Sequence, residues 1–441
     1  MPVNRAPLAA FPEDIARSDL PSAVEVAPRP IIRSLFYVFI FSLPFEALDL
    51  GTGAALSKIV GYVFLLATLS QPQICFRRPP VAFWCFGAYL IVYAVLGLFQ
   101  SSVYEDEILE RFLTLTQLLG LFLIGYNLMR YADVARGAMI TLAIACVTVS
   151  LLHATGVAAE PKGTGTEAER MTALGQNANR LAGMLSIGLL GLMGLTYGPG
   201  KTLIRPRLLV WPFFVLLGFS VVLTGSRGGL LALVGGLLAF MLRGGTLQTR
   251  MRNLLIAFLV MGFLVAVSLQ LEFVRQRWER SLTTGHMAGR EALYPAATQM
   301  FLERPLTGWG PIRHLYELGY RVRYVQMGHD PHQPWRDTHN IFLYVLTQVG
   351  LLGSLPFFAG LWLCVHASWR AARSAWGVAP FAMTVTLLIV NTSGTLLHFK
   401  LHWFTLALVL ACGSKSIGVK LWPATAPPEP LASRFPAPAA T

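Results

Sequence analysis

His339 is the residue whose type and position best suit chemistry. Asn340 follows it, and Gly350 and Gly353 lie further along, where a polar segment gives way to a long apolar one. An α-helix turns about 100° per residue, so a continuous helix would place Gly350 within about 20° of His339 and Gly353 within about 40° on the other side. Glycines let a neighbouring helix pack closely. We therefore expect an imidazole, with an ordinary pKa of about 6.5, at the membrane surface on the bundle side, where it can transfer protons. The alternative is a histidine that only caps the helix beside a packing groove.

Arginines next to glycines form a second group of candidates. A planar guanidinium binds phosphate oxygens in pairs, so a phosphate or pyrophosphate group is the ligand that such residues favour. Each segment alone is also typical of a helix cap or a membrane anchor. The segments are TGSRGG with Arg227, GREALY with Arg290, and RMTALGQNANR with Arg170 and Arg180 at its ends.

Long apolar stretches must position these residues. The chain has 441 residues, of which 54% are hydrophobic and 13% charged, with a mean hydropathy of +0.56. Stretches of about 20 apolar residues are long enough to cross a bilayer. The sequence predicts an all-α polytopic membrane protein with about twelve transmembrane helices, at 33–48, 54–71, 81–99, 111–129, 137–153, 177–197, 208–224, 228–242, 253–270, 340–366, 379–397 and 401–413.

The distribution of basic residues predicts the orientation. With a cytoplasmic N-terminus, the short cytoplasmic loops are all basic, as the positive-inside rule requires, and the C-terminus is cytoplasmic too. The net charge of +13 then reflects topology rather than nucleic-acid binding. The expected organisation is a disordered tail at 1–30, nine helices within 31–270, a small helical domain outside the membrane at 271–338, three helices within 339–413, and a second tail at 414–441.

Motifs for nucleotides, metals and disulfides are absent from the sequence. There is no Walker loop, GxGxxG, HExxH or GxSxG segment, and the five cysteines form no CxxC pair. His329 and His332 precede His339, but their spacing matches no recurrent metal site. We predict neither a metal nor a cofactor. The run RQRWER at 275–280, beside Glu272 and Glu279, is typical of an ion-paired helix at the membrane interface.

Together the segments resemble the bacterial O-antigen ligase and polymerase superfamily. The resemblance covers about 170–353 and depends on SRGG, on GREALY followed by PLTGWG, and on HN-x9-GxxG. It implies a glycosyltransferase of the bacterial inner membrane, with its active site and the 271–338 domain on the periplasmic face. The implied donor is a polysaccharide on undecaprenyl diphosphate. The implied acceptor is a sugar hydroxyl of lipid A-core in a ligase, or another lipid-linked glycan in a polymerase.

The residues suit this chemistry. Displacing a diphosphate from an anomeric carbon requires charge stabilisation on the phosphate and proton removal from the attacking hydroxyl. We predict His339 as the general base of an inverting displacement, with Arg227 and Arg290 on the diphosphate. Asp337 would orient the imidazole, or else cap the helix that begins near His339. Further predicted substrate contacts are Arg170, Arg180, Asn340 and Trp309. Five aromatic residues could stack on sugars or could instead form an interfacial belt: Trp309, Tyr316, Tyr320, Tyr324 and Trp335.

Two other functions fit parts of the pattern. A polymerase of the same superfamily would share every motif, because acceptor choice depends on a cavity that the sequence does not show. A transporter of lipid-linked saccharides or anions is the alternative from another class. Transporters place coupling charges near the bilayer midplane and show repeated halves. Here the charges gather at one predicted face, which favours the enzyme.

Overall fold

The chain is described from a computed structural model. The structure describes residues 27–46, 55–156, 159–161, 171–173, 176–198, 207–242, 247–270, 289–325 and 335–414, together with residues 272, 275, 276, 279 and 283. Residues 28–416 form one compact unit. Most of the two predicted tails, 1–26 and 415–441, lies outside the described residues, as do Arg170, His329 and His332.

Each of the twelve predicted segments contains an apolar helix. Five helices are long and apolar enough to cross a membrane, at 81–98, 102–129, 132–154, 178–197 and 341–371, and the others are shorter. The number of crossings therefore stays a prediction. The twelve helices are α1 (Pro30–Ser42), α2 (Leu56–Thr68), α4 (Val81–Leu98), α5 (Glu105–Met129), α6 (Ala132–Ala154), α7 (Ala178–Tyr197), α8 (Trp211–Leu223), α9 (Arg227–Leu242), α10 (Leu247–Gln270), α14 (Ile341–Ala371), α15 (Ala379–Ser393) and α16 (Lys400–Gly413).

Short elements connect the apolar helices. They are the 3-10 turns η1 (Leu43–Phe45), η2 (Ser102–Tyr104) and η4 (Arg207–Val210), the helix α3 (Pro72–Cys75), and the strands β1 (Ala159–Pro161) and β2 (Met171–Ala173). The two strands pair antiparallel, with Ala159 opposite Ala173. Strand β2 contacts α6 and α7, so this hairpin lies near the beginning of α7.

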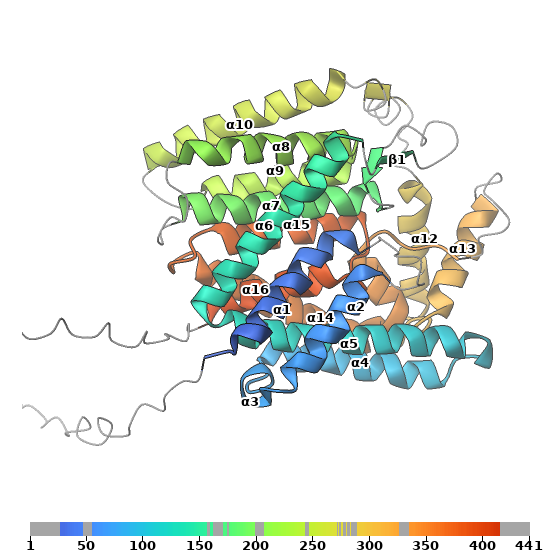
Figure 1. Cartoon of the computed structure of the whole chain (residues 1–441). Coiled ribbons are helices and arrows are strands. Elements are labelled where there is room, and N and C mark those ends of the chain that lie inside the picture. The colour runs from blue at the N-terminus through green and yellow to red at the C-terminus, as the bar shows by residue number, and fades with distance from the viewer. Residues whose placement is uncertain are drawn as a thin grey trace, which may run out of the picture. The chain divides into compact units, whose positions relative to one another are not determined.

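Two groups of helices pack around α14 and α15. Helix α14 packs on α4 and α16, while α15 packs on α7 and α9 and also touches α14. Figure 1 shows these helices side by side, with α6 crossing α7 and α10 beside α8. Most are apolar on every side, as expected for helices surrounded by protein and lipid.

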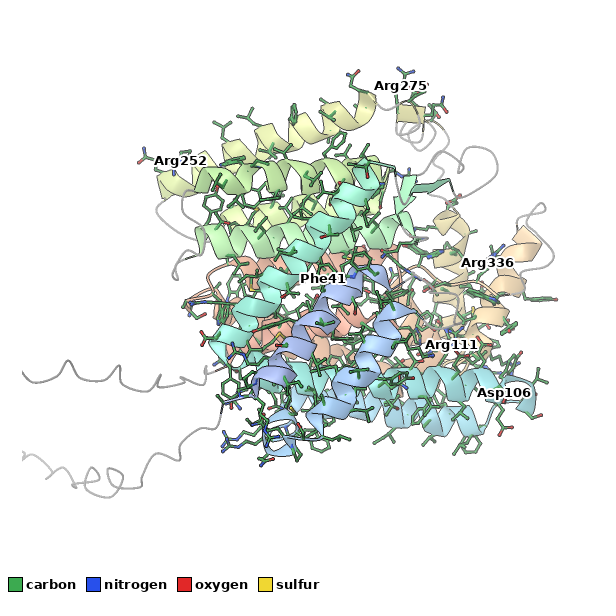
Figure 2. All side chains as sticks on the ribbon, viewed as in Figure 1. Phe41, Asp106, Arg111, Arg252, Arg275 and Arg336 are labelled. Atoms are coloured by element: carbon green, nitrogen blue, oxygen red, sulfur yellow. The ribbon has the colours of Figure 1, made fainter. Side chains whose placement is uncertain are left out.

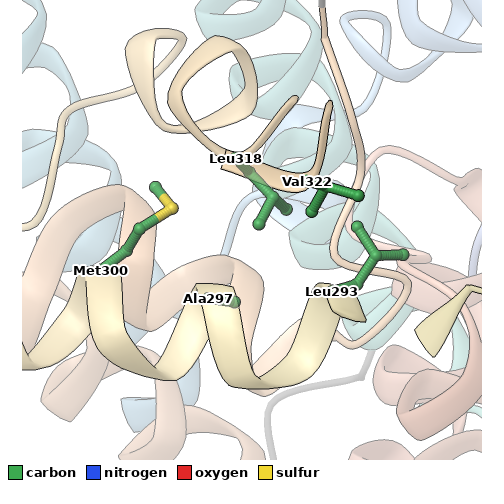
Figure 3. Close-up of a cluster of buried hydrophobic side chains, with 5 residues drawn as sticks. All are labelled: Leu293, Ala297, Met300, Leu318 and Val322. Carbon is green, nitrogen blue, oxygen red and sulfur yellow. The ribbon is translucent and has the colours of Figure 1, made fainter. Parts of the chain in front are cut away.

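Two shorter helices lie between α10 and α14 in the sequence and pack on each other. They are α12 (Arg290–Glu303) and α13 (Arg313–Val325). Leu293, Ala297 and Met300 of α12 face Leu318 and Val322 of α13, and these five side chains form a buried cluster (Figure 3). The described part of 271–338 thus contains two packed helices, and a separate domain outside the membrane stays a prediction. Helix α12 also contacts α14, which brings this pair of helices to the beginning of α14.

The prediction that Gly350 lies on a continuous helical face shared with His339 is wrong. Gly350 has φ 56° and ψ −161°, so α14 is interrupted there and the rotation per residue no longer relates it to His339. This conformation is accessible almost only to glycine. A Cβ at Gly350 would also collide with the carbonyl group of Leu306. Gly350 therefore serves a backbone-to-backbone contact rather than a helix-packing face.

The interruption of α14 receives the PLTGWG loop, residues 305–310. Two carbonyls freed before Gly350 accept from this loop: Thr347 O from Trp309 N at 2.8 Å, and Gln348 O from Gly310 N at 2.9 Å. Two amides after Gly350 donate to it: Leu351 N to Pro305 O at 2.8 Å, and Leu352 N to Leu306 O at 3.1 Å. We call these four bonds the clasp. The clasp provides hydrogen-bond partners for backbone groups that lipid could not hydrogen-bond. It also joins two motifs that are about 40 residues apart in the sequence.

Candidate functional site

His339 lies outside α14, in a strained conformation just before it. Its φ is 50°, and it is the one residue other than glycine with positive φ in the described part of the chain. Asn340 caps α14: its Oδ1 accepts from Phe342 N at 2.9 Å and from Leu343 N at 3.3 Å. The predicted substrate contact Asn340 therefore has a structural task. Positive φ costs a non-glycine residue of order 1–3 kcal/mol, so the surrounding structure must hold His339 in place.

Asp337 supplies part of that restraint. Its Oδ1 accepts from the backbone N of His339 at 2.9 Å and from Thr395 Oγ1 at 2.7 Å. The first bond is an Asx turn, which stabilises tight backbone geometry. The alternative prediction that Asp337 caps the helix is wrong, because Asn340 is the cap. Asp337 instead ties His339 to the segment 392–399, which joins α15 to α16.

The segment 392–399 also accepts a hydrogen bond from Arg290, the first residue of α12. Arg290 Nη2 donates to Ser393 O at 2.7 Å, and Tyr294 Oη, one turn along α12, donates to Thr392 O at 2.7 Å. Arg290 Nε is buried and has no hydrogen-bond partner in the part of the chain that the structure describes. A half-buried guanidinium with one buried, unused donor favours binding of an anion, because an unsatisfied buried donor is costly.

Arg227 approaches Arg290 from α9. Ser226 begins the helix: its Oγ accepts from Gly229 N at 2.9 Å and donates to Asn179 Oδ1 on α7 at 2.6 Å. A Cβ at Gly228 would collide with Ser393, and one at Gly229 with Ala182. The two glycines thus let α9 lie against α7 and the end of α15. The charge of Arg290 acts directly on Arg227, so two cations are held as neighbours.

Arg180 reaches the same place from α7. The helix is capped by Asn177, whose Oδ1 accepts from Asn179 N at 2.9 Å. The guanidinium carbon lies 3.6 Å from the centre of the Phe399 ring, a cation–π contact that helps to hold the side chain in place. The acids that act on Arg180 are Asp337 and Glu46, and Glu46 is already paired with Lys400. Arg180 therefore keeps much of its positive charge for a ligand.

The electrostatics of His339 follow from this arrangement. Partial desolvation of the ring by the surrounding protein lowers the pKa of His339 below its ordinary 6.5, and the charges of Arg290, Arg180 and Arg336 lower it further, while Asp337 opposes them. The imidazole is consequently neutral at pH 7 and can accept a proton. His339 is still exposed as a residue, so a substrate can reach it.

Trp309 belongs to a different environment. Its Nε1 donates to Met300 O at 2.8 Å, and the guanidinium carbons of Arg304, Arg321 and Arg313 lie 4.3, 5.0 and 5.5 Å from its ring centre. These contacts join Trp309 to α12 and α13 rather than to His339. Its predicted stacking on a sugar stays a prediction. Among groups of His, Cys, Asp and Glu, the described residues contain none that could hold a metal ion.

Three residues of the site were missed by sequence reasoning. Thr395, Phe399 and Ser393 all lie between or at the ends of α15 and α16, and their roles depend on a hydroxyl, a ring and a backbone carbonyl. No motif in the sequence marks them. The run HFKLHW at 398–403, with its basic and aromatic side chains where the apolar helix α16 begins, was the available signal.

Comparison with known proteins supports the resemblance drawn from the motifs. Residues 212–358 match a family described as O-antigen ligase. This range contains Arg227, Arg290, the PLTGWG loop, His339 and Gly350, whereas Arg180 and segment 392–399 lie outside it. A comparison with curated proteins gave no match.

Proposed function

We propose that the protein transfers a polysaccharide from undecaprenyl diphosphate to a sugar hydroxyl of lipid A-core, because residues 212–358 match a family described as O-antigen ligase. Members of this family are glycosyltransferase-like enzymes, and several helices here are apolar enough for a multi-pass membrane protein. The reaction takes place on the periplasmic face of the bacterial inner membrane and uses neither metal nor cofactor. The donor and acceptor are both lipid-linked glycans.

One observation carries the proposal. The charges of Arg180 and Arg290, which start from two different helices, act on His339 together with that of Arg336, and Arg227 from a third helix neighbours Arg290. Holding like charges together is unfavourable unless a ligand compensates them, and a diphosphate with its bridging and terminal oxygens is such a ligand.

The proposed reaction is a single displacement. The oxygen of the acceptor hydroxyl attacks the anomeric carbon of the donor, and its proton passes to the imidazole of His339. The bond between the anomeric carbon and the diphosphate oxygen breaks with inversion, and undecaprenyl diphosphate leaves. Arg227 and Arg290 neutralise the charge that develops on the leaving oxygen, with Arg180 as a third contact. Asp337 stabilises the imidazolium that forms.

A polymerase would use the same site with a different acceptor. Both activities are compatible with the family domain. If the protein is a ligase, the purified protein given lipid-linked polysaccharide and lipid A-core should attach the polysaccharide to lipid A-core. If the product is instead a longer glycan on undecaprenyl diphosphate, the polymerase assignment replaces it.

The arginine roles are tested by Arg227→Lys and Arg290→Lys, with Arg275→Lys as control. Arg275 pairs with Glu272 at 2.6 Å and lies beyond α10, far from Arg336 in Figure 2. An ammonium keeps the charge but loses the two-pronged geometry, so we expect kcat/KM to fall about tenfold or more in each site variant and to stay unchanged in the control. Wild-type rates in both site variants would show that these arginines do not hold the diphosphate.

The role of His339 is tested by His339→Asn. Asparagine tolerates positive φ, so this variant should keep the wild-type thermal stability while losing the base. A positioned base contributes typically 10²–10⁴-fold, and we expect a loss of about that size in kcat. A variant that turns over lipid-linked donor at the normal rate would remove the base assignment.

A further inference from the structure

A cleft lies at the opposite end of α12 from Arg290. Its volume is about 620 Å³, and it opens between the end of α4 and the loop that leads from α12 to α13. One wall carries Phe99, Gln100 and Tyr104, and the other carries Arg304, Trp309 and Arg313. The walls are fixed to each other, because Gln100 Nε2 donates to Trp309 O at 3.1 Å and Gln100 Oε1 accepts from Ile312 N at 3.1 Å. The cleft is therefore already formed without a ligand.

Two cations, Arg304 and Arg313, line this cleft; Glu303, which is paired with Arg321, acts on Arg304 only through its charge. Both Arg304 and Arg313 lie over the ring of Trp309, and no carboxylate is among the lining residues. In the described ranges, neither of the two arginines has an ion-pair partner. Arg321, the third arginine beside this ring, is different: it binds Glu303 at 2.6 Å and Glu317 at 2.8 Å. Two free guanidinium groups beside aromatic rings favour an anionic ligand with sugar character.

The rim of the cleft is apolar and exposed. Phe99, which lines the cleft, is 83% exposed, and two residues adjacent in sequence to lining residues, Leu98 and Leu306, are 84% and 61% exposed. Helix α4 is long and apolar enough to cross a membrane, so its end lies where lipid headgroups lie. A ligand at this place can keep its acyl chains against the apolar rim and its anionic headgroup between the arginines.

The cleft is also well separated from the candidate active site. Arg290 is the first residue of α12 and Arg304 follows its last, and a helix of this length, 14 residues, spans about 21 Å. A ligand held at Arg304 therefore cannot be the diphosphate held at Arg290. It can be a second lipid whose sugars extend along α12 towards His339.

We propose that the cleft between Arg304 and Arg313 binds the phosphate-bearing, lipid-proximal sugars of the acceptor glycolipid, while the outer sugar of the same acceptor reaches His339. This inference rests on the proposed function and names the acceptor class of that reaction. It requires an acceptor with anionic groups close to its acyl chains and several sugars beyond them.

Direct binding tests the proposal without any turnover. The probe is a bis-phosphorylated, acylated diglucosamine lipid, titrated onto full-length protein in neutral nanodiscs. For Arg304→Gln/Arg313→Gln we expect a Kd about 100-fold higher than in the wild type, at about tenfold for each lost guanidinium contact. Arg304→Lys/Arg313→Lys keeps the charges and should lose less. Arg275→Gln is the matched control, because Arg275 is also exposed but paired. Equal Kd values for the wild type and the double Gln variant would overturn the proposal.

Two further arms identify the ligand. The dephosphorylated lipid should bind the wild type and the double Gln variant equally weakly. Phosphatidylglycerol should bind the wild type more weakly than the diglucosamine lipid; equal or tighter binding would show a general site for anionic lipid and overturn the acceptor assignment. His339→Asn should bind the probe like the wild type. Because binding is measured without transfer, loss of the proposed function would leave this result intact, and a failed binding test would leave the proposed reaction intact. In transfer assays, the double Gln variant should raise the KM for acceptor and leave the KM for donor unchanged.

Discussion

Replacement of Gly350 by alanine should open the clasp between α14 and the PLTGWG loop. Two costs combine. The backbone at Gly350, with φ 56° and ψ −161°, is strained for any L residue by about 1–3 kcal/mol. The new Cβ would also collide with the carbonyl of Leu306, so the loop must move and weaken the four bonds of the clasp, each worth about 0.5–1.5 kcal/mol. We expect the free energy of unfolding to fall by about 3 kcal/mol or more.

Hydrogen exchange and thermal unfolding measure this effect. The amides of Trp309, Gly310, Leu351 and Leu352 donate the clasp bonds, so their peptides should exchange faster in Gly350→Ala by about a hundredfold, which corresponds to about 3 kcal/mol. The Tm in detergent should fall as well. Turnover should also decrease, because the part of α14 that begins beside His339 would no longer be fixed against α12.

Gly120→Ala provides the matched control. Gly120 lies within α5, and a Cβ there would meet nothing within 4 Å. Alanine is a better helix former than glycine, so this variant should be neutral or more stable by up to about 1 kcal/mol. If Gly350→Ala behaved like Gly120→Ala in both Tm and exchange, the clasp would contribute nothing to stability and the reasoning would be refuted.

The remaining predictions concern the site. Since the neutral imidazole is the base and the pKa of His339 is below 6.5, the acid limb of the pH profile of kcat/KM should lie below pH 6.5. Asp337→Asn removes the group that raises this pKa, so the acid limb should move to still lower pH. A shift of the limb to higher pH would contradict the assignment of His339 as the base. Thr395→Val removes the hydroxyl that donates to Asp337 and should lower kcat about tenfold, while Thr395→Ser should restore it; equal rates in both would remove the positioning role. Arg180→Lys loses the guanidinium contact with the Phe399 ring and should raise the KM for donor, and an unchanged KM would show that Arg180 does not contact the diphosphate. Treatment with EDTA should leave the transfer rate unchanged; activity lost with EDTA and restored by Mg²⁺ would reveal a metal site.

The sequence alone determined the helices and the candidate side chains. Apolar stretches of sufficient length must form helices in lipid, because only helices and closed barrels satisfy the backbone there, and each of the twelve predicted segments contains one. Glycines and polar residues punctuate these stretches, so the turn at Ser226 and the beginning of α12 after Gly289 were readable locally. Residue type singled out His339, Arg227 and Arg290, because topology disfavours basic residues on the predicted outer face.

Tertiary structure decided how these residues meet. The interruption at Gly350 is invisible in the pattern, because a glycine inside an apolar run fits a helix as well as a break; only the approach of Leu306 selects the break. Arg180 and Phe399 are more than two hundred residues apart in sequence, so no local sequence signal could have predicted their contact. Asp337 likewise meets Thr395 through the packing of α14 on α15. Such contacts depend on which helices become neighbours, and helix packing is set by the shapes of whole surfaces rather than by any short segment.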